Sequence, residues 1–574
     1  MNHICENLHN CENDGHADVV PVDVLVIGGG VNGLAVAREA QLRGLSTMVV
    51  DGQDFGAGTS GASSRLVHGG IRYLENLEFG LVRESLKERE RLLYTAAHLV
   101  KPFPLLIPFY RHNRRHPFIL SLGMLLYDVL SFDKSTPVHR TFTKRATEKA
   151  YPGLANENLS GATLYYDAQA ANTERLCIEQ AIDLVALGGT ALNHTKVTAI
   201  TQDGAGHTVS NTASHATVLT VSLENTLTGA TSTQRATTVV NAGGPWVDGV
   251  LALEKNESPR LIGGSKGSHF TVGPFTGAPT TGVHFEAISD GRAILVLPLP
   301  DGNFLIGATD IFYDGNPEDA VMSDAEISYL LAEVNQLIPE ARLTEAHVLH
   351  SVSGIRPLPY SPKAKSAAHV SRSHHLVAHP TVPGLFSVTG GKLTTHRALG
   401  EMAIDTIEKL QRNVSLRASL KRLFAGPTAS SRRLKLPGAR TASWSAFETA
   451  FLAETTLPAP TARRLLDLYG VRAAEIESLV RSDVTLGTAL PGNNRSVAAE
   501  VPFVIHTEFA RTLTDIVGRR LLLAWDDDAG LDSIEAVAEL AAKELGWNSN
   551  QTNQELHDYR SWIRLRRPAA YEPA

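Results

Sequence analysis

The sequence predicts an α/β fold in which a Rossmann-like nucleotide-binding domain is interleaved with a sheet-rich domain, and a helical C-terminal domain follows. Three observations predict this arrangement. A strand–helix–strand pattern fills residues 23–51, short strand-like runs occupy residues 195–245, and helical patterns rich in Ala, Leu and Glu prevail beyond residue 411. At 574 residues the chain is long enough for several domains.

The first three elements form a βαβ unit. DVLVIGG (23–29) is a continuous apolar run that ends in glycines, which is typical of a buried parallel strand. VNGLAVAREAQLRG (31–44) has helical spacing and stops at a glycine, and LSTMVVD (45–51) is a second strand. This unit opens the nucleotide-binding domain.

The turn of this unit carries Gly28, Gly30 and Gly33 at GxGxxG spacing. The first glycine permits a tight turn, the second lets the backbone approach a pyrophosphate, and the third lets the helix and the strand pack closely. The N–H groups at the start of the helix then bind the phosphates. Asp51 ends the second strand, where an acid bonds ribose hydroxyls and argues against a 2′-phosphate. The spacing alone would also fit a plain turn, but together these features predict an NAD or FAD site.

Later elements are predicted from apolar spacing and from start and stop signals. The elements expected are helices over 85–100, 173–189, 323–339 and 392–410, a hairpin over 293–310 with its turn at Asp301-Gly302, a strand over 384–391, and a linker over 428–443. We expect a disordered tail over 1–20, a discontinuous nucleotide-binding domain over 21–75, 150–255 and 355–410, a substrate-binding domain over 76–149 and 256–354, and a helical domain over 411–574.

Composition excludes several classes of protein. A net charge of −7 argues against a nucleic-acid binder, and 43% hydrophobic with 20% charged residues is typical of a globular chain. Three cysteines are too few for a disulfide framework and fit a reducing cytoplasm. We expect no metal site, although Cys5 and Cys11 with His9 and His16 offer one set of ligands in the polar tail. That tail lacks the apolar core of a secretory signal, and no apolar run is long enough to span a membrane.

Two further glycine-rich strand ends favour a large flavin nucleotide. VVNAGGPW (239–246) and VTGGKLTT (388–395) return late in the chain. Each alone is equally consistent with a tight turn. A flavin that touches several strand ends would use both.

Six motifs together resemble the FAD-dependent glycerol-3-phosphate dehydrogenases, the aerobic, quinone-linked members of the D-amino-acid-oxidase-like flavoproteins: VIGGGVNG, GTSGASSRLVHGGIRYLE, NAGGPWV, SKGSH, SGIRPL and GGKLTT. The resemblance implies FAD as the cofactor of the nucleotide-binding domain. It also implies oxidation of sn-glycerol 3-phosphate to dihydroxyacetone phosphate, with hydride transfer to FAD and electron transfer to a membrane quinone, in glycerol and glycerophosphate catabolism.

The substrate implied by the resemblance is a dianion, so cations should converge on it. By motif, the expected catalytic residues are His269, as the base that removes the hydroxyl proton, and Arg356. A lone cation is ordinarily a surface or salt-bridging residue, but the glycine-framed loops here favour binding. Extra glycines before Lys266 leave the direction of that loop open. The substrate-binding set expected is Arg72, Tyr73, His269, Arg356, Arg372 and Lys392.

The same match assigns residues to the cofactor. His68, in VHGG, is interpreted as a cofactor contact, with the base as its alternative role. The cofactor-binding residues expected are Gly28, Gly30, Asn32, Gly33, Asp51, Ser60, Ser64, Leu66, His68, Gly69, Val197, Gly243, Gly391, Leu393 and Thr394.

A basic cluster of Arg111, Arg114 and Arg115 precedes the apolar run PFILSLGMLLYDVLSF (117–132). Such a segment either presses into an anionic leaflet or is a buried helix with a solvated basic edge. Members of the resembled family associate with membranes, which favours peripheral attachment to the cytoplasmic, inner face of the cell membrane. The partners expected are sn-glycerol 3-phosphate, a membrane quinone and an anionic membrane surface, with a homodimer as one option and no nucleic acid.

Three other functions compete with this interpretation. The main alternative is an oxygen-using glycerol-3-phosphate oxidase of the same fold, which typically carries a sizeable insertion that is not seen here. A non-catalytic nucleotide-binding regulator is opposed by the converging cations and His269. A nicotinamide-dependent dehydrogenase would be excluded by flavin absorbance in the purified protein.

Overall fold

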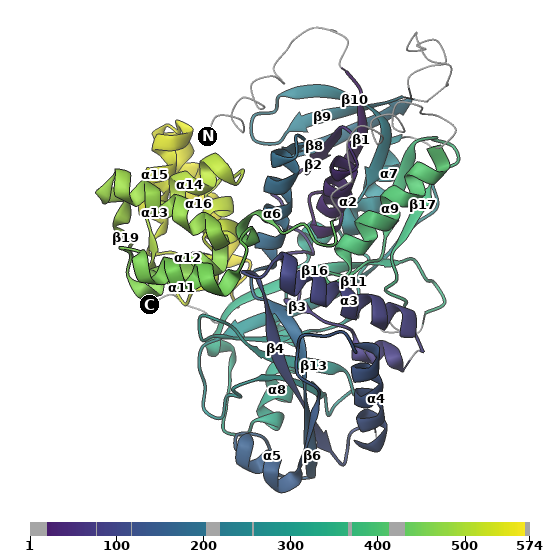
Figure 1. Ribbon diagram of the computed structural model, residues 1–574, viewed down its shortest axis with the longest axis vertical. Helices are drawn as coiled ribbons and strands as arrows, with labels where there is room; N and C mark the ends of the chain where they lie inside the picture. The colour runs from purple at the N-terminus through teal and green to yellow at the C-terminus, as the bar shows by residue number, and fades with distance from the viewer. Residues whose placement is uncertain are drawn as a thin grey trace.

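The computed structural model describes residues 20–75, 77–115, 117–202, 218–254, 258–364, 370–411 and 431–568. In Figure 1 the sheet that contains β1 lies at the top, a second sheet lies below it, and the helical C-terminal domain lies to the left of their junction. This arrangement confirms the predicted α/β fold class with two interleaved sheets and a helical C-terminal domain. The predicted tail and its Cys5, His9, Cys11 and His16 lie outside the described residues, except for residue 20.

The first sheet is built around parallel strands, as the βαβ unit predicts. β1 pairs in parallel with β2 and β10, and the helices α2, α6 and α9 pack together on this body. Its strand order is β17-β18-β10-β1-β2-β7, with β8 and β9 continuing from β10. The strands are β1 (Val22–Ile27), β2 (Thr47–Val50), β7 (Thr190–Leu192), β8 (Thr195–Gln202), β9 (Leu219–Asn225), β10 (Thr231–Asn241), β17 (His375–Ala378) and β18 (Leu385–Thr389).

The second sheet is mostly antiparallel and is assembled from two separate stretches of the chain, β3–β6 and β11–β16. Its order is β15-β11-β14-β13-β12-β4-β6-β3, with β16 beside β11 and β5 beside β6. The strands are β3 (Leu66–Val67), β4 (Val100–Tyr110), β5 (Arg140–Thr143), β6 (Leu159–Ala170), β11 (Ile262–Val272), β12 (Gly282–Glu286), β13 (Ala293–Pro298), β14 (Phe304–Gly307), β15 (Ile311–Phe312) and β16 (Val348–Pro359). β6 belongs to this second sheet because it pairs along its length with β4. The predicted boundaries instead placed it, within residues 150–255, in the nucleotide-binding domain.

Helices cover both sheets and make up most of the C-terminal domain. The α-helices of the body are α2 (Val31–Leu42), α3 (Phe79–Thr95), α4 (Pro117–Leu130), α5 (Lys144–Ala150), α6 (Thr173–Ala186), α7 (Val247–Leu251), α8 (Asp324–Leu337) and α9 (His396–Gln411). The C-terminal domain contains α11 (Trp444–Glu454), α12 (Ala459–Tyr469), α13 (Ala473–Ser482), α14 (Glu500–Thr507), α15 (Ile534–Leu545) and α16 (Ser549–Arg564), with a short hairpin of β19 (Ala489–Leu490) and β20 (Asn493–Val497).

Two predicted helices have different bounds, for local reasons. The helix expected over 85–100 ends at Thr95, because the residues from Val100 onward pair with β6 as a strand. The helix expected over 392–410 begins only at His396, because Gly390 and Gly391 have φ values of 71° and 95° and the chain turns before the helix starts. The capping box of the helix expected over 323–339 is present, with Ser323 as its cap.

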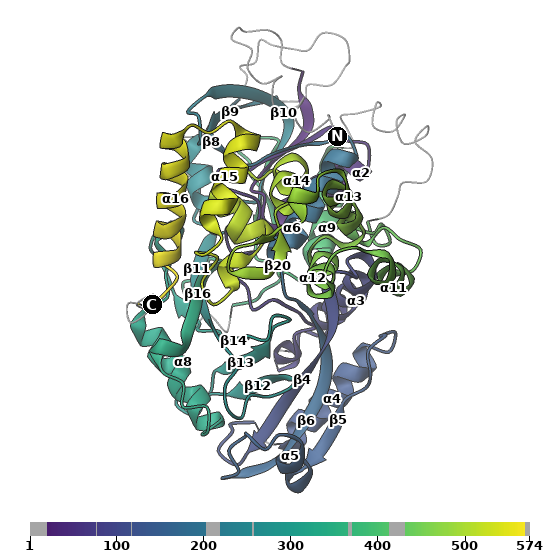
Figure 2. The same cartoon turned by 90° about the vertical axis from the view of Figure 1, so that its left-hand side faces the viewer.

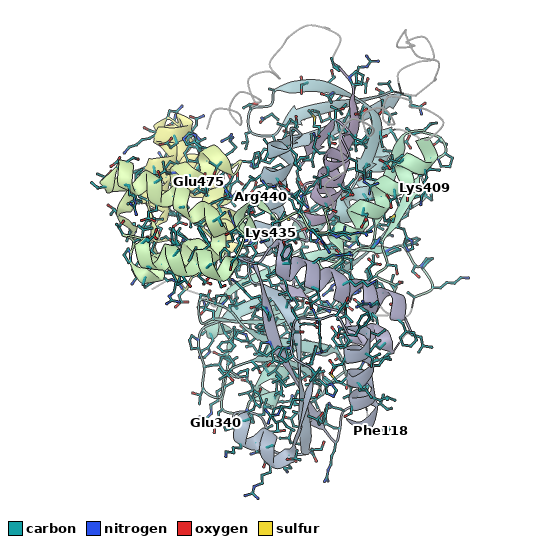
Figure 3. The ribbon with its side chains drawn as sticks, in the orientation of Figure 1. Phe118, Glu340, Lys409, Lys435, Arg440 and Glu475 are labelled. Carbon is teal, nitrogen blue, oxygen red and sulfur yellow. The ribbon has the colours of Figure 1, made fainter. Side chains whose placement is uncertain are left out.

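The described part of the predicted linker is docked on the body. The backbone N–H of Leu436 donates to the Thr95 carbonyl over 2.8 Å, and the N–H of Gly438 donates to the Glu179 carboxylate over 2.6 Å. Figure 3 shows Lys435 and Arg440 at the junction between the helical domain and the body. Residues 431–443 therefore form a fixed strap.

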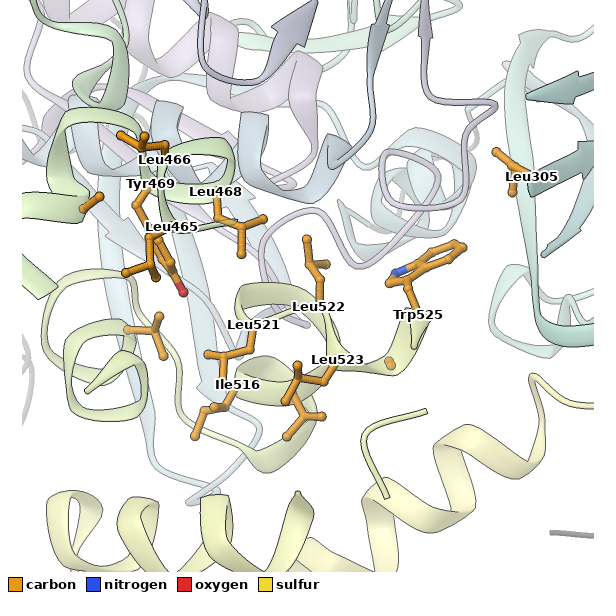
Figure 4. Close-up of a cluster of buried hydrophobic side chains, with 14 of the residues drawn as sticks. Leu305, Leu465, Leu466, Leu468, Tyr469, Ile516, Leu521, Leu522, Leu523 and Trp525 are labelled. Carbon is orange, nitrogen blue, oxygen red and sulfur yellow. The ribbon is translucent and has the colours of Figure 1, made fainter. Parts of the chain in front are cut away.

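Buried ion pairs and an apolar core join the C-terminal domain to both sheets. Glu508 accepts hydrogen bonds from Arg175 of α6, and Asp54, just beyond β2, pairs with Arg520 over 2.7 Å. In Figure 2 the helices of this domain lie in front of the region of β11 and β16. Figure 4 shows the leucines of its core, from which Trp525 extends toward the strand that carries Leu305.

Candidate active site

A cavity of about 1220 Å³ lies between the two sheets. Gly28, Asp51, Gly243 and Gly391 follow the parallel strands β1, β2, β10 and β18 and line one end of it. Residues of β11, β13 and β16 in the second sheet line the other end. This placement agrees with the rule that ligands bind beyond the carboxyl ends of the strands in open α/β sheets.

The glycine turn has the geometry that a dinucleotide needs. Gly28 has a φ of 108°, and a Cβ at Gly33 would collide with the Gly28 carbonyl oxygen, so the helix can lie this close only with a glycine there. Gly30 caps α2 without a side chain, and the start of the helix lines the cavity, with the N–H of Val31 donating to the Ser60 hydroxyl over 3.0 Å. The described residues therefore fit a pyrophosphate at this helix N-terminus.

Asp51 organises the same turn. One carboxylate oxygen accepts the N–H of Gly29 over 2.6 Å, and the other accepts the N–H of Gln53 over 2.8 Å. Burial raises the pKa of Asp51 to about 6. Asp51 also lines the cavity, so its contact with a ribose stays a prediction that the position allows.

Most of the predicted site residues line this one cavity, although they come from distant parts of the chain. Gly33, Gly69 and Thr394 instead lie behind its wall, and the side chain of Arg72 lies outside the described part of the structure. The predicted residues that line it are Gly28, Gly30, Asn32, Asp51, Ser60, Ser64, Leu66, His68, Tyr73, Val197, Gly243, His269, Arg356, Arg372, Gly391, Lys392 and Leu393.

Two of the residues behind the wall brace the segment that carries His68. The hydroxyl of Thr394 accepts the backbone N–H of His68 over 3.0 Å and donates to its carbonyl over 3.2 Å. The N–H of Gly69 donates to the Tyr127 hydroxyl over 2.9 Å. Both residues thus hold the cavity wall in place.

His269 lies on β11, and its side chain is almost fully buried, with 2% exposed. Its Nε2 lies 2.8 Å from the hydroxyl oxygen of Ser64, and its Nδ1 has no hydrogen-bond partner among the described residues. Burial, followed by the charges of Arg356 and Arg65, lowers the pKa of His269 to about 3. The imidazole is therefore neutral at physiological pH and has a lone pair that can accept a proton.

Arg356 lies on β16, opposite Ser265 of β11. Its guanidinium packs against Gly267, where any Cβ would collide with it, and Asp310 accepts a hydrogen bond from it over 3.1 Å. The glycines that precede His269 thus belong to a regular strand, and Gly267 makes room for this arginine. Lys266 instead pairs with Glu326 over 2.8 Å.

Lys392 adds a second cation to the cavity. Its Nζ lies 3.8 Å from the centre of the Tyr73 ring and 3.3 Å from the Ser85 hydroxyl. Burial and then the neighbouring Arg372 lower the pKa of Lys392 to about 7. Lys392 and Arg372 thus bring positive charge to the wall of the same cavity, which suits an anionic ligand.

Sequence reasoning missed residues that act across long distances in the chain. Asp310 orients Arg356, and Ser268 and Thr309 both donate to the buried Glu326, over 2.8 and 2.7 Å. The run GATD (307–310) before β15 was the only local signal for two of them. Another trio of residues, Asp54, His194 and Asp515, has the spacing of a metal site, but Arg519 and Arg520 already pair with its acids.

The comparisons with known proteins agree with this geometry. A family profile described as FAD dependent oxidoreductase matches residues 23–406, and one described as the C-terminal domain of alpha-glycerophosphate oxidase matches residues 429–552. A glycerol-3-phosphate dehydrogenase of Synechocystis is 37% identical over 94% of this chain and 96% of its own length. The chain belongs to the FAD-dependent glycerol-3-phosphate dehydrogenase family. The family match confirms the predicted cofactor, FAD.

The chain is also similar to a second curated dehydrogenase, and it shares the fold of two solved structures. Glycerol-3-phosphate dehydrogenase 2 of Mycobacterium tuberculosis is 32% identical over 94% of this chain and 87% of its own. The glycerol-3-phosphate dehydrogenase of Bacillus halodurans, solved with FAD, shares the fold over 100% of both chains with a TM-score of 0.77 and 24% identity. The L-α-glycerophosphate oxidase of Mycoplasma pneumoniae, also solved with FAD, aligns with 67% of this chain and 94% of its own, with a TM-score of 0.50 and 18% identity.

Proposed function

We propose that this protein oxidises sn-glycerol 3-phosphate at C2 to dihydroxyacetone phosphate. The observation that carries the proposal is one cavity that combines the dinucleotide turn, the neutral His269, and the cations Arg356 and Lys392. The dehydrogenases to which the chain is similar are named for the same substrate. When bound, FAD supplies the acceptor of the two electrons.

Different side chains bind the two ends of the substrate, its phosphate and its C2 hydroxyl. Arg356, with its planar fork held by Asp310, binds oxygens of the substrate phosphate, and Lys392 adds a compact charge. Tyr73, under Lys392, and Arg372, beside it, complete the described part of the phosphate site. These contacts fix C2 near His269.

His269 accepts the proton of the C2 hydroxyl. Its ring is neutral and is oriented by Ser64, so no proton must leave before the reaction begins. Positive charge from Arg356 and Arg65 lowers the basicity of the imidazole, and a bound phosphate dianion offsets that effect. His68 stays the alternative base, since it lines the same cavity.

For the electron acceptor we propose a membrane quinone. The support is an apolar stripe on α4, where Phe118, Leu122, Leu125 and Val129 recur at helical spacing and are 71%, 57%, 55% and 60% exposed. Figure 3 shows Phe118 at the outer surface of the molecule. Such a stripe is typical of helices that lie in a membrane interface. The alternative acceptor is oxygen, which the name of the C-terminal domain profile favours.

We propose peripheral attachment to the inner, cytoplasmic face of the cell membrane, with the same stripe as the membrane contact. Arg111 and Arg114 are exposed beside it, whereas Arg115 pairs with Glu75 and Glu286 and is withdrawn from the predicted basic cluster. No helix among the described residues has the length and apolar character to cross a bilayer. A homodimer stays a prediction.

Anaerobic reduction of the flavin tests the reaction. We expect sn-glycerol 3-phosphate, but not glycerol, to bleach the flavin absorbance, and Arg356→Ala to slow this by at least about 100-fold because a charged hydrogen-bonding partner of the phosphate is lost. Arg260→Ala, at an exposed arginine paired with Asp314, is the control and should leave the rate unchanged. Equal bleaching by glycerol would contradict the phosphate site. Reoxidation by a quinone analogue, compared with oxygen, separates the two acceptors.

A further inference from the structure

Trp525 of the C-terminal domain reaches the back of the candidate active site. It ends a short turn, Leu523–Trp525, and its side chain is buried, with 8% exposed. Its ring centre lies 4.0 Å from the guanidinium carbon of Arg65 and 4.6 Å from the ring centre of His350. Figure 4 shows it extending away from the leucines of its own domain, toward the strand of Leu305. Trp525 thus contacts two elements of the body at once.

The first contact controls the neighbour of Ser64. Arg65 has a φ of 58°, a left-handed conformation that costs free energy for a residue with a side chain, so surrounding contacts must hold it. Glu174 pairs with its guanidinium over 2.8 Å, and the face of Trp525 covers it. The hydroxyl of the adjacent Ser64 lies 2.8 Å from Nε2 of His269. The contact with Arg65 therefore influences the partner of the proposed base.

The second contact presses on the sheet that carries His269. His350 of β16 stands opposite Thr271 of β11, two residues along the strand from His269. Alternate residues of a strand, and their antiparallel partners, share one face of the sheet, so His350 and His269 lie on the same face. Trp525 packs on that face at His350. A second attachment lies next to it, since the N–H of Ser351 donates to the Arg566 carbonyl over 2.6 Å.

We propose that Trp525 is a positioning residue for His269, through which the C-terminal domain holds the Ser64 hydroxyl and strand β11 in the geometry of proton transfer. Trp525 touches neither substrate nor cofactor in this role. The kinetic consequence rests on the proposed function, whereas the consequence for the exposure of His269 does not.

Kinetics of the FAD-loaded protein test the role. In Trp525→Leu we expect the rate of flavin reduction by sn-glycerol 3-phosphate to fall at least tenfold, with KM changed less than threefold, because Arg356 and Lys392 are untouched. Trp525→Phe keeps an aromatic face and should stay within threefold of the wild type. Trp547→Leu is the matched control, since Trp547 is a partly buried tryptophan of the same hydrophobic cluster outside the described contacts of Arg65 and His350. Trp525→Met replaces the leucine variant if that variant does not fold.

A second readout is independent of activity. Wild-type His269 is buried and should react slowly with diethyl pyrocarbonate, as mapped by mass spectrometry of FAD-loaded protein without substrate. We expect its modification to be at least fivefold faster in Trp525→Leu and unchanged in Trp547→Leu. Unchanged modification of His269 in Trp525→Leu, or a rate loss equal to that of Trp547→Leu, would overturn the proposal. If the wild-type flavin is not reduced by the substrate, the proposed function fails, and the modification experiment still decides the role of Trp525.

Discussion

The guanidinium of Arg356 rests against Gly267, two residues before His269 on the neighbouring strand. Antiparallel pairing of β11 with β16 therefore brings the proposed phosphate-binding cation and the proposed base to one end of the cavity. A Cβ at residue 267 would collide with the guanidinium of Arg356 in this position.

Gly267→Ala should impair substrate binding without loss of FAD. A methyl group there collides with the guanidinium and displaces Arg356 from the cavity. We expect KM for sn-glycerol 3-phosphate to rise roughly 10- to 100-fold, the scale of one charge-assisted phosphate contact. Steady-state kinetics and flavin content measure this. The control is Gly273→Ala, where a Cβ on the residue after β11 meets open space. A normal KM in Gly267→Ala would contradict the placement of Arg356.

Substrate binding should weaken as the pH rises above 7. Lys392 is a cation below its pKa of about 7 and is neutral above it, so the free protein loses a phosphate-binding charge between pH 7 and 9. We expect KM to rise by up to about tenfold per pH unit in that range. Lys392→Arg, with a side chain that stays charged, should give a flat KM, and Lys392→Met a high but equally flat one. A KM independent of pH in the wild type would argue against the lowered pKa.

Membrane attachment should depend on the apolar stripe of α4. Replacing Leu122 and Leu125 together by Glu removes exposed apolar surface worth roughly 1.5–3 kcal/mol per inserted leucine. We expect sedimentation with vesicles of phosphatidylglycerol and phosphatidylcholine to fall at least tenfold. Val484→Glu, at an 81% exposed valine of the C-terminal domain, is the control. Unchanged vesicle binding by the double variant would contradict the proposal that α4 is the membrane contact.

Stability should fall in acid through Glu508. Burial opposes its ionisation, but Arg175 and Arg472 outweigh burial and lower the pKa of Glu508 to about 2, from 4.5. Its contribution is complete above pH 4.5 and is lost as the pH falls from 4.5 toward 2, by roughly 3 kcal/mol in total. Glu508→Gln should lose stability at pH 7, because two buried arginines lose their carboxylate.

Urea unfolding of wild type and Glu508→Gln between pH 3 and pH 7 measures this difference. We expect the gap between the two curves to narrow as the pH falls. Glu475→Gln, at a carboxylate that is 55% exposed, should follow the wild type. A constant gap across the range would show that ionisation of Glu508 does not contribute.

Local patterns predicted the dinucleotide turn and the regular elements around it. Gly28, Gly33 and Asp51 are close in sequence, and the reason for each residue type is a backbone contact within the same unit. The hairpin of β13 and β14 was equally visible, because its turn residues and its strands are adjacent. Such elements can be predicted because the residues that determine them are close together in the sequence.

The remaining features depend on contacts between distant residues. Asp310 orients Arg356, Ser64 meets His269, and Trp525 covers Arg65, yet no spacing rule connects the members of any pair. The family resemblance suggested that His269 and Arg356 share a site, whereas Trp525, which packs behind them, gave no local signal. β4 escaped prediction for a related reason, since its partner β6 lies far along the chain.

The strap at residues 431–443 bears on how the enzyme must exchange its substrate. Leu436 and Gly438 are hydrogen-bonded to α3 and α6 of the body, and Arg440 is paired with Asp183. A domain that opens as a lid needs a flexible hinge, and the strap cannot act as one because it is bonded to the body. The helical domain is therefore held fixed against the catalytic body. Substrate and product must enter and leave through other openings in the cavity wall.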